Sequence, residues 1–344
     1  MIEEGISVLI PSGAGAPGFA GISACLREDA RIRLVSGDMN DQAYGKSLSD
    51  AFYLMPPSEH PDYTTRLREI CQIENIKVVL PITTRELIVL AREKQALEDA
   101  GIRVVISQSA ALSLSNDKGK LHRHAHEIGV SVPEGGVCTD KVEFESLAED
   151  LLSRHEFLFF KPTIGNGSRG IGLIARDIKL SMSNAKPELM PLLLKEWMNR
   201  IPEKFDTPLL LTEFLPGKEY SVDAFVWPDN DTVIIPRSRD KMVSGISVSG
   251  SFVNNDTLIS ETSKLLKSLD LMGPIGIQWR NNGEGVPHLL EVNPRLQGTT
   301  SALRHAGVNI PLMAVYRALK WDVEIPEKIH WNRGFTRYWQ DVFL

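Results

Sequence analysis

The chain has few cysteines, no excess of basic charge and no long apolar run. Its 344 residues include three cysteines, Cys25, Cys71 and Cys138, which lie far apart and in no metal-binding spacing. Such a sparse, odd set argues against a disulfide framework and favours reduced thiols in the cytosol. The net charge is −6, so no global basic field points to nucleic acid or to an anionic membrane.

The N-terminal segment MIEEGISVLI is acidic where a signal peptide would be basic. No apolar run approaches the length of about 18 residues that a membrane span needs. We therefore expect a cytoplasmic protein with neither nucleic acid nor membrane as a partner. Hydrophobic residues make up 42% of the chain and charged residues 24%, ordinary values that exclude wholesale disorder. At about 150 residues per domain, the length predicts two or three domains.

The first third of the chain alternates short apolar runs with helical patterns. Strands are predicted at 6–10, 32–35, 77–80 and 103–106, and helices at 19–28, 62–73 and 86–99. Alternating strands and helices predict right-handed crossovers and a parallel sheet. We therefore predict a doubly wound α/β domain over residues 1–115.

After residue 115 the pattern changes to strand-like runs joined by short loops. The predicted strands lie at 157–161, 171–175, 209–214, 220–227, 232–236, 276–280 and 288–293. They indicate a mainly antiparallel α+β region, which we divide into domains at 116–205 and 206–344. The Ser- and Gly-rich segment 244–251 is interpreted as a flexible substrate loop or a turn.

A glycine motif follows the first predicted strand. Gly13, Gly15 and Gly18 match G-x-G-x-x-G, and Asp38 follows 20 residues after Gly18. This spacing fits a dinucleotide site and hence an NAD(P)-dependent oxidoreductase. A tight strand-to-helix turn would need the same glycines, and Pro17 lacks the N–H group that a phosphate would use. Both interpretations stay open here.

A second glycine-rich segment, FKPTIGNGSRGI at 160–171, lies between two predicted strands. The backbone N–H groups of such a loop can surround phosphate oxygens. It is not a Walker A loop, because no Lys-Ser/Thr closes it and a strand follows it. An ordinary hairpin is the alternative.

The segment LTEFLPGKEYSVD at 211–223 predicts a strand, a Pro-Gly turn and a second strand. Its edge can offer backbone N–H and C=O groups to a planar heterocycle, with Glu219 placed to accept from sugar hydroxyls. An antiparallel hairpin with a surface glutamate is the alternative.

The third motif combines Gln278 with the segment Glu291-Val292-Asn293-Pro294-Arg295. Glu291 and Asn293 share one face of a predicted strand because side chains alternate with a period of two. With Gln278 from the neighbouring strand they form an oxygen-rich set that suits Mg²⁺ or Mn²⁺ and leaves other positions to water and substrate phosphates. Arg295 could reach the same phosphates. A polar trio without a metal is the alternative.

Three of these motifs, at 160–171, 211–223 and 278–295, occur in an order that resembles the ATP-grasp superfamily. The resemblance is above all to its carbamoyl phosphate synthase and biotin carboxylase branch. The resemblance covers roughly residues 116–306. It implies a two-part ATP-grasp fold after a doubly wound pre-ATP-grasp domain. It also implies an ATP-dependent ligase that turns a carboxylate into an acyl phosphate and couples it to an amine. The expected partners are these small molecules, with a homodimer left open.

The resemblance implies a role for each matching residue. The ATP-binding residues would be Lys118, Lys161, Gly165, Gly167, Ser168, Gly170, Glu213, Phe214, Leu215 and Glu219. Lys161 and Arg295 would act in catalysis, Arg295 by stabilising the transferring phosphoryl group. The metal ligands would be Gln278, Glu291 and Asn293. Many ATP-grasp enzymes have a carboxylate at the position of Gln278, so the number of bound metal ions stays open.

Candidate substrate contacts lie nearby. Arg237 or Arg239 could hold a substrate carboxylate bidentately, and Asp223 could face a substrate ammonium, although side chains at such positions often point to solvent.

Two further functions stay open. One is carbamoyl-phosphate-synthase-like activation of bicarbonate, although a complete synthase carries two ATP-grasp units in a larger chain. The other is a nucleotide-binding regulatory module without turnover.

Overall fold

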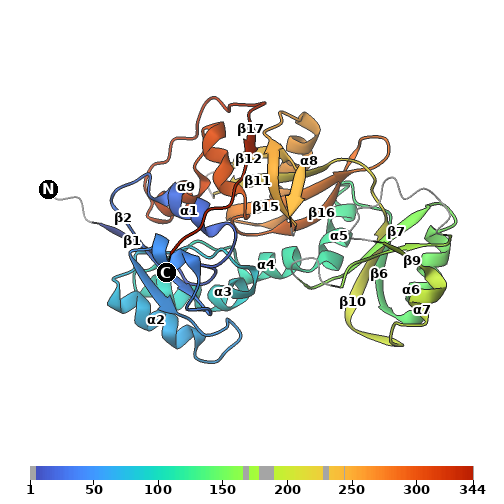
Figure 1. Cartoon of the computed structure of the whole chain (residues 1–344), viewed down its shortest axis with the longest axis horizontal. Coiled ribbons are helices and arrows are strands. Elements are labelled where there is room, and N and C mark those ends of the chain that lie inside the picture. Colours follow the sequence, from blue (N-terminus) through green and yellow to red (C-terminus); the bar gives the residue numbers. More distant parts are fainter. Residues whose placement is uncertain (1–4, 166–169, 178–189, 228–231, 244, 344) are drawn as a thin grey trace. The chain divides into compact units, whose positions relative to one another are not determined.

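The computed structural model describes residues 5–165, 170–177, 190–227, 232–243 and 245–343 (Figure 1). The chain divides into two compact units, each built from separate segments. The first comprises Met1–Ser113, Ser221–Ile277 and Asn293–Leu344, and the second comprises Leu114–Tyr220 and Gln278–Val292. The domain limits predicted from the sequence stay a prediction. Within the described ranges, no helix is both long and apolar enough to cross a membrane.

A five-stranded parallel sheet in the order β3-β2-β1-β4-β5 organises the N-terminal part of the first unit. Its strands are β1 (Ile6–Ile10), β2 (Ile32–Asp38), β3 (Ala51–Leu54), β4 (Val78–Val79) and β5 (Arg103–Val104). The helices between them are α1 (Phe19–Leu26), α2 (Tyr63–Ile73) and α3 (Thr84–Asp99), and α4 (Ser109–Asn116) follows. The predicted doubly wound region is therefore confirmed.

Both faces of this sheet are buried because side chains on β1 alternate between two cores. Val8 and Ile10 pack with Phe19 of α1, whereas Leu9 packs on the other face with residues of α2 and α3 such as Leu67. In Figure 1, α1 accordingly lies on one side of the sheet and α2 on the other. A sheet covered on both faces explains why its strands read as continuous apolar runs.

The rest of the first unit includes a three-stranded sheet in the order β13-β14-β17. Its further elements are β12 (Thr232–Ser238), β13 (Lys241–Val243), β14 (Ile246–Ser251), β17 (Gly334–Thr336), α8 (Asp256–Leu269) and α9 (Ile310–Ala318). The interpretation of 244–251 as a loop or turn was wrong for the residues that form β14. The small residues have a packing reason, since a Cβ on Gly250 would lie 2.1 Å from the carbonyl oxygen of Ser238.

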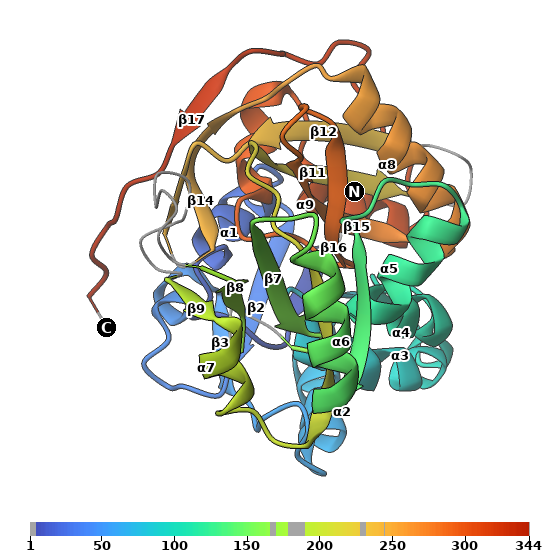
Figure 2. The ribbon, with the colours of Figure 1, turned by 90° about the vertical axis from the view of Figure 1, so that its right-hand side faces the viewer.

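The second unit holds a five-stranded sheet in the order β6-β10-β7-β8-β9. Its elements are α5 (Lys118–Glu127), β6 (Gly135–Asp140), α6 (Lys141–Leu151), β7 (Phe157–Pro162), β8 (Gly172–Ala175), β9 (Pro191–Leu193), α7 (Leu194–Met198) and β10 (Lys204–Glu213). Figure 2 shows α6 and α7 on the same face of this sheet. Phe144 of α6, Phe160 of β7 and Trp197 of α7 pack there as one aromatic group.

A four-stranded sheet in the order β12-β11-β15-β16 completes the fold. Its other strands are β11 (Glu219–Val226), β15 (Gly273–Asn281) and β16 (Pro287–Asn293). On β15, Ile277 and Trp279 are buried, whereas Gln278 and Arg280 are half-buried. This alternation places the polar side chains on the face opposite the core. The predicted α+β region is confirmed.

Candidate active site

Lys161 lies at the end of β7 and is central to the candidate site in the second unit. Its Nζ donates a hydrogen bond of 2.9 Å to the carbonyl oxygen of Leu290 on β16. Burial lowers the pKa of Lys161 to about 8. The charge of Lys118 lowers this pKa further, and the carboxylates of Glu291 and Glu219 partly oppose the shift. Lys118, Glu219 and Glu291, each predicted to bind ATP or metal, therefore act on Lys161 at short range.

Lys118 is the first residue of α5, whose N-cap is Asp117. Its backbone N–H donates to the carbonyl of Thr163 at 2.8 Å, and its Nζ donates to the carbonyl of Gly165, also at 2.8 Å. These two bonds tie the N-terminus of α5 to the beginning of the glycine-rich loop. A helix N-terminus carries partial positive charge, so this junction favours an anion.

The glycine-rich loop connects β7 to β8. Gly167 and Ser168 fall in the stretch 166–169, which lies outside the described residues. Gly170 has a φ of +68°, and a Cβ there would lie 3.0 Å from Cγ of Pro162. Glycine at 170 therefore has a conformational reason of its own. The phosphate contacts assigned to Gly165, Gly167, Ser168 and Gly170 stay predictions.

The predicted adenine edge follows β10. The backbone N–H groups of Glu213 and Phe214 donate to the carbonyl oxygens of Glu134 and Phe157, at 2.8 and 3.0 Å. The Glu213 carboxylate also accepts the backbone N–H of Glu134 at 3.0 Å. The edge that could read a heterocycle through its N–H groups therefore begins at Leu215, whose side chain is buried.

Arg280, which was not predicted as a site residue from the sequence, lies beside this edge. Its Nε donates to the carbonyl of Gly217 at 3.2 Å, and its Nη1 lies 3.8 Å from Oε2 of Glu219. The guanidinium carbon lies 5.0 Å from the centre of the Phe214 ring. Burial lowers the pKa of Arg280, and Glu219 opposes that shift. The signal was present, because Arg280 follows Gln278 by two residues and shares its face of β15.

The three predicted metal ligands lie on neighbouring strands. Gln278 is half-buried on β15, and Glu291 and Asn293 are half-buried on β16, where the intervening Val292 is buried. Oδ1 of Asn293 accepts from Nη2 of Arg295 at 3.3 Å, and an amide oxygen can accept a second partner. These oxygen donors fit Mg²⁺ provided that water and phosphate oxygens complete the coordination. Among the described residues, no three His, Cys, Asp or Glu side chains are grouped to hold a metal.

Arg295 follows β16 and belongs to the first unit. Its Nε donates to Oγ1 of Thr84 at 2.9 Å, and its Nη1 donates to the carbonyl of Leu296 at 2.8 Å. Thr84 is the first residue of α3. Together with the contact to Asn293, these bonds hold the guanidinium in one orientation. Its role toward the phosphoryl group stays a prediction.

Two predicted substrate residues pair with each other in the first unit. Arg237 and Asp223 are both buried, and Nε of Arg237 donates to Oδ2 of Asp223 at 2.7 Å. Thr300 donates to the other carboxylate oxygen at 2.5 Å, and Nη1 of Arg237 reaches Oγ of Ser247 at 3.2 Å. Arg239 is half-buried, and its Nη1 donates to Ser221 at 3.1 Å. The pairing by itself explains the charges of Asp223 and Arg237, so their contact with substrate stays a prediction, as it does for Arg239.

The N-terminal glycine turn uses its N–H groups within the chain. The N–H of Gly15 donates to Oδ2 of Asp38 at 2.8 Å, and that of Ala14 donates to the carbonyl of Gly37 at 3.3 Å. A Cβ on Gly18 would lie 2.8 Å from Cα of Gly298. Turn formation and close packing therefore explain these glycines without a dinucleotide, and Asp38 is engaged by the turn itself.

Two family descriptions match the chain. Residues 205–340 match the family described as ATP-grasp in the biosynthetic pathway with Ter operon, and residues 22–105 match the PylC-like N-terminal domain. The carbamoyl phosphate synthase large chain of Thermomicrobium roseum is 25% identical over 230 residues, which are 64% of this chain. The chain spans about a fifth of the length of that relative.

Solved structures share the fold at low sequence identity. N5-carboxyaminoimidazole synthetase from Staphylococcus aureus, complexed with ADP, has a TM-score of 0.72 at 12% identity and covers 97% of this chain and 81% of its own. Biotin carboxylase from Campylobacter jejuni, in a β-γ-ATP complex, has a TM-score of 0.71 at 15% identity, with 95% and 74% covered. L-amino acid ligase from Bacillus licheniformis has a TM-score of 0.65 at 14% identity, with 92% and 75% covered.

These findings confirm the resemblance that the three motifs carry. The fold likeness extends over nearly the whole chain, and the two family matches fall on its N-terminal and C-terminal parts. Residues 205–340 therefore resemble an ATP-grasp domain, and residues 22–105 resemble a PylC-like N-terminal domain.

Proposed function

We propose that the chain is an ATP- and Mg²⁺-dependent ligase that phosphorylates a small carboxylate and couples the acyl phosphate to an amine. The observation that carries the proposal is the environment of Lys161. A half-buried lysine lies within electrostatic reach of Lys118, Glu219 and Glu291, the residues assigned to phosphate, ribose and metal. The ATP-grasp match and the solved ligase with the same fold support it.

Phosphoryl transfer requires positioned positive charge more than covalent chemistry from the protein. Lys161 and Lys118 would bind the phosphates of ATP, and Arg295 would stabilise the transferring group. Gln278, Glu291 and Asn293 would hold Mg²⁺, which when bound neutralises charge that develops on the phosphate oxygens. Glu219 would accept from the ribose hydroxyls, with Arg280 fixing the orientation of its carboxylate.

The test measures ADP release from the purified chain with Mg²⁺, ATP and a panel of carboxylic acids. Hydroxylamine is added in place of the amine, because it converts an acyl phosphate into a stable hydroxamate. We expect ADP and hydroxamate in equal amounts with at least one acid, and both formed on the order of a hundredfold more slowly by Glu291→Gln. Carboxylate-independent ADP release would contradict the proposal. ATP binding without any turnover across the panel would also contradict it and would favour a regulatory module.

Bicarbonate is the second candidate substrate, since the matching relative is a carbamoyl phosphate synthase large chain. The two functions separate in an assay that contains bicarbonate and ammonia and no organic acid. Bicarbonate-dependent ADP release there would favour activation of bicarbonate.

Quenching of nicotinamide fluorescence tests the dinucleotide alternative.

We also propose that Mn²⁺ can replace Mg²⁺, that the protein acts in the cytoplasm and that it forms a homodimer. The oxygen donors of the metal set are suited to either ion. Sedimentation at micromolar concentration tests the dimer, and a monomer at all concentrations would contradict it.

A further inference from the structure

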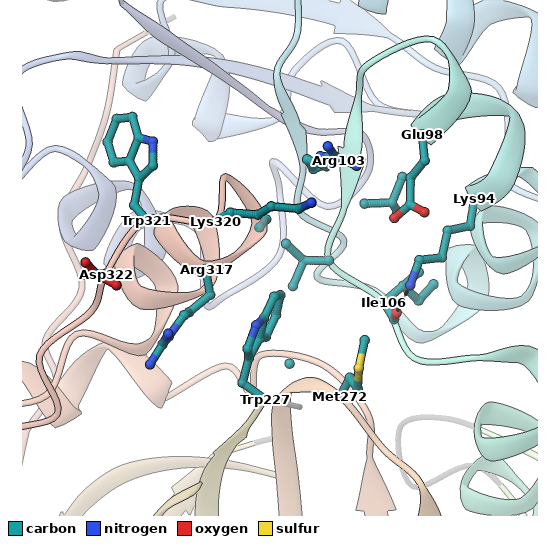
Figure 3. Close-up of a pocket in the computed structure, with 14 residues that line it drawn as sticks. Lys94, Glu98, Arg103, Ile106, Trp227, Met272, Arg317, Lys320, Trp321 and Asp322 are labelled. Atoms are coloured by element: carbon teal, nitrogen blue, oxygen red, sulfur yellow. Dashed lines mark hydrogen bonds between the residues drawn. The ribbon is translucent and has the colours of Figure 1, made fainter. Parts of the chain in front are cut away.

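The first unit contains a cavity that the proposed function does not use. Its volume is about 430 Å³, within the range of about 300–1,000 Å³ that small-molecule sites occupy. It lies along β5, which is an edge strand of the parallel sheet. The end of α3, the strand ends around Trp227 and Met272, and the segment after α9 form its other walls (Figure 3).

Positive charge predominates on these walls, although the whole chain carries a net charge of −6. The lining cations are Lys94, Arg103, Arg317 and Lys320, and the lining acids are Glu98 and Asp322. Lys94 and Glu98 lie one turn apart on α3, so their charges largely offset each other. The excess therefore comes from the cations on β5 and on the segment that ends α9.

Two of these cations line the cavity without a partner among the described residues. In Figure 3, Lys320 extends from the end of α9 toward Arg103 on β5. Neither side chain makes a hydrogen bond or an ion pair with any other described residue. Two like charges that line one cavity repel each other, and a bound anion offsets that repulsion. Their arrangement therefore favours a bound anion.

The backbone of β5 also offers a hydrogen-bond donor near Arg103. The N–H groups of Arg103 and Val105 donate to the carbonyls of Lys77, just before β4, and of Val79 on β4. Since successive N–H groups in a strand point in opposite directions, the N–H of Val104 points away from β4, toward the open edge. An anion near Arg103 could accept from it.

Aromatic side chains also line the cavity. Trp227 lines the cavity and stacks on Phe225 at 5.9 Å with an interplanar angle of 12°, so its indole ring is held in place. Trp321 also lines the cavity, and the guanidinium of Arg31 lies 5.0 Å from its ring centre. Fixed indole rings favour a flat apolar group on the ligand.

We propose that this cavity is a second ligand site, which binds a small organic anion that carries an aromatic ring. The anion lies between Arg103 and Lys320, and the ring lies against Trp227. The site is independent of the proposed ligase activity, since none of its residues belongs to the ATP or metal set.

The experiment titrates the full chain by calorimetry with four probes, in the presence of saturating Mg²⁺ and ADP. Phenyl phosphate and benzoate carry both features, inorganic phosphate lacks the ring, and phenol lacks the charge. We expect one of the first two to bind at least about tenfold more tightly than phosphate and phenol, and the difference between them identifies the anionic group. Equal affinity of phenol and phenyl phosphate, or no binding of either aromatic anion at millimolar concentration, would overturn the proposal.

Variants of the lining cations test whether the aromatic anion binds in this cavity. Lys320 has a φ of +62°, a conformation that asparagine tolerates well, so Lys320→Asn removes the charge with little strain. Lys320→Asn and Arg103→Gln are each expected to weaken binding about tenfold or more. Lys267→Asn, which changes an exposed lysine on α8 outside the cavity, is the matched control. Unchanged affinity in both cavity variants, or loss of binding in Glu291→Gln, would place the ligand elsewhere and refute the inference.

Discussion

The lowered pKa of Lys161, together with its proposed contact to ATP, predicts that ATP affinity depends on pH in an unusual range. With a pKa of about 8, the charged fraction of Lys161 falls from about three quarters at pH 7.5 to about a tenth at pH 9. In the proposed role of Lys161, only the charged form would attract the phosphates. The affinity for MgADP or MgATP should therefore fall roughly eightfold over this interval, whereas an ordinary lysine would stay charged throughout.

The variant Lys161→Met removes the charge and keeps an apolar chain of similar length. We expect it to bind MgADP about ten- to a hundredfold more weakly at pH 7.5, which corresponds to losing about 1.5–3 kcal/mol. Its affinity should no longer change between pH 7.5 and 9. The matched control is Lys120→Met on α5, which changes an exposed lysine and should keep the wild-type pH profile.

Calorimetric titration with MgADP at half-unit pH steps measures both effects. His122 also lies near Lys161, but burial lowers the pKa of His122 below its usual 6.5, so it stays neutral in this range. Glu219 and Glu291 act on Lys161 as well, and they oppose its pKa shift. A wild-type affinity that varies less than twofold, or a pH profile retained by Lys161→Met, would refute the assignment.

Thermal unfolding distinguishes weaker MgADP binding by Lys161→Met from simple damage to the fold. The pKa of Lys161 lies below the ordinary value of 10.5, so the folded chain binds fewer protons than the unfolded chain between about pH 8 and 10.5. Its contribution to the free energy of unfolding therefore rises with pH across that window, and below pH 8 the buried charge is destabilising. Lys161→Met should accordingly melt at a higher temperature than the wild type at pH 7, with the difference shrinking toward pH 10.

Three further perturbations test other residues. Glu291→Gln removes the carboxylate from the metal set and should lower the rate of ADP release on the order of a hundredfold or more, with the melting temperature as its control. Arg280→Met should raise the KM for ATP about three- to tenfold with little change in kcat, because it loses the contacts to Glu219 and Phe214; a fall in kcat alone would contradict this positioning role. Asp223→Asn should lower the free energy of unfolding in urea by about 3–5 kcal/mol, because it leaves the Arg237 charge buried without a full partner.

The parallel sheet was predictable because both of its faces are buried, so its longer strands stand out as apolar runs. β3 was missed because three of its four residues are half-buried and Leu54 is exposed, which leaves no clear apolar or alternating pattern. β14 was missed because serine and glycine mask its alternation. Gly250 is required by the close approach of Ser238, and sequence patterns do not show such tertiary contacts.

The motifs of the candidate site could be recognised in the sequence, but the sequence did not show which of their residues lie close together in the fold. Lys118 and Lys161 are 43 positions apart in the sequence, and only the fold shows that the charge of one lowers the pKa of the other. Arg280 could have been predicted by extending the period of two one step beyond Gln278. The buried pairing of Asp223 with Arg237 could not, because the two residues come from different strands whose register the sequence does not specify.

The two kinds of buried charge in this chain differ in a way that bears on function. Arg237 is paired with Asp223 and Ser247, and Asp223 also accepts from Thr300, so that group satisfies its charges within the protein. Lys161, in contrast, makes no ion pair within 4 Å to any described residue, and the carboxylates near it leave its pKa lowered to about 8. Burying such a cation destabilises the fold unless an anion completes its environment. The phosphates of a bound nucleotide would do so, which is why the stability and binding measurements on Lys161→Met should change in opposite directions.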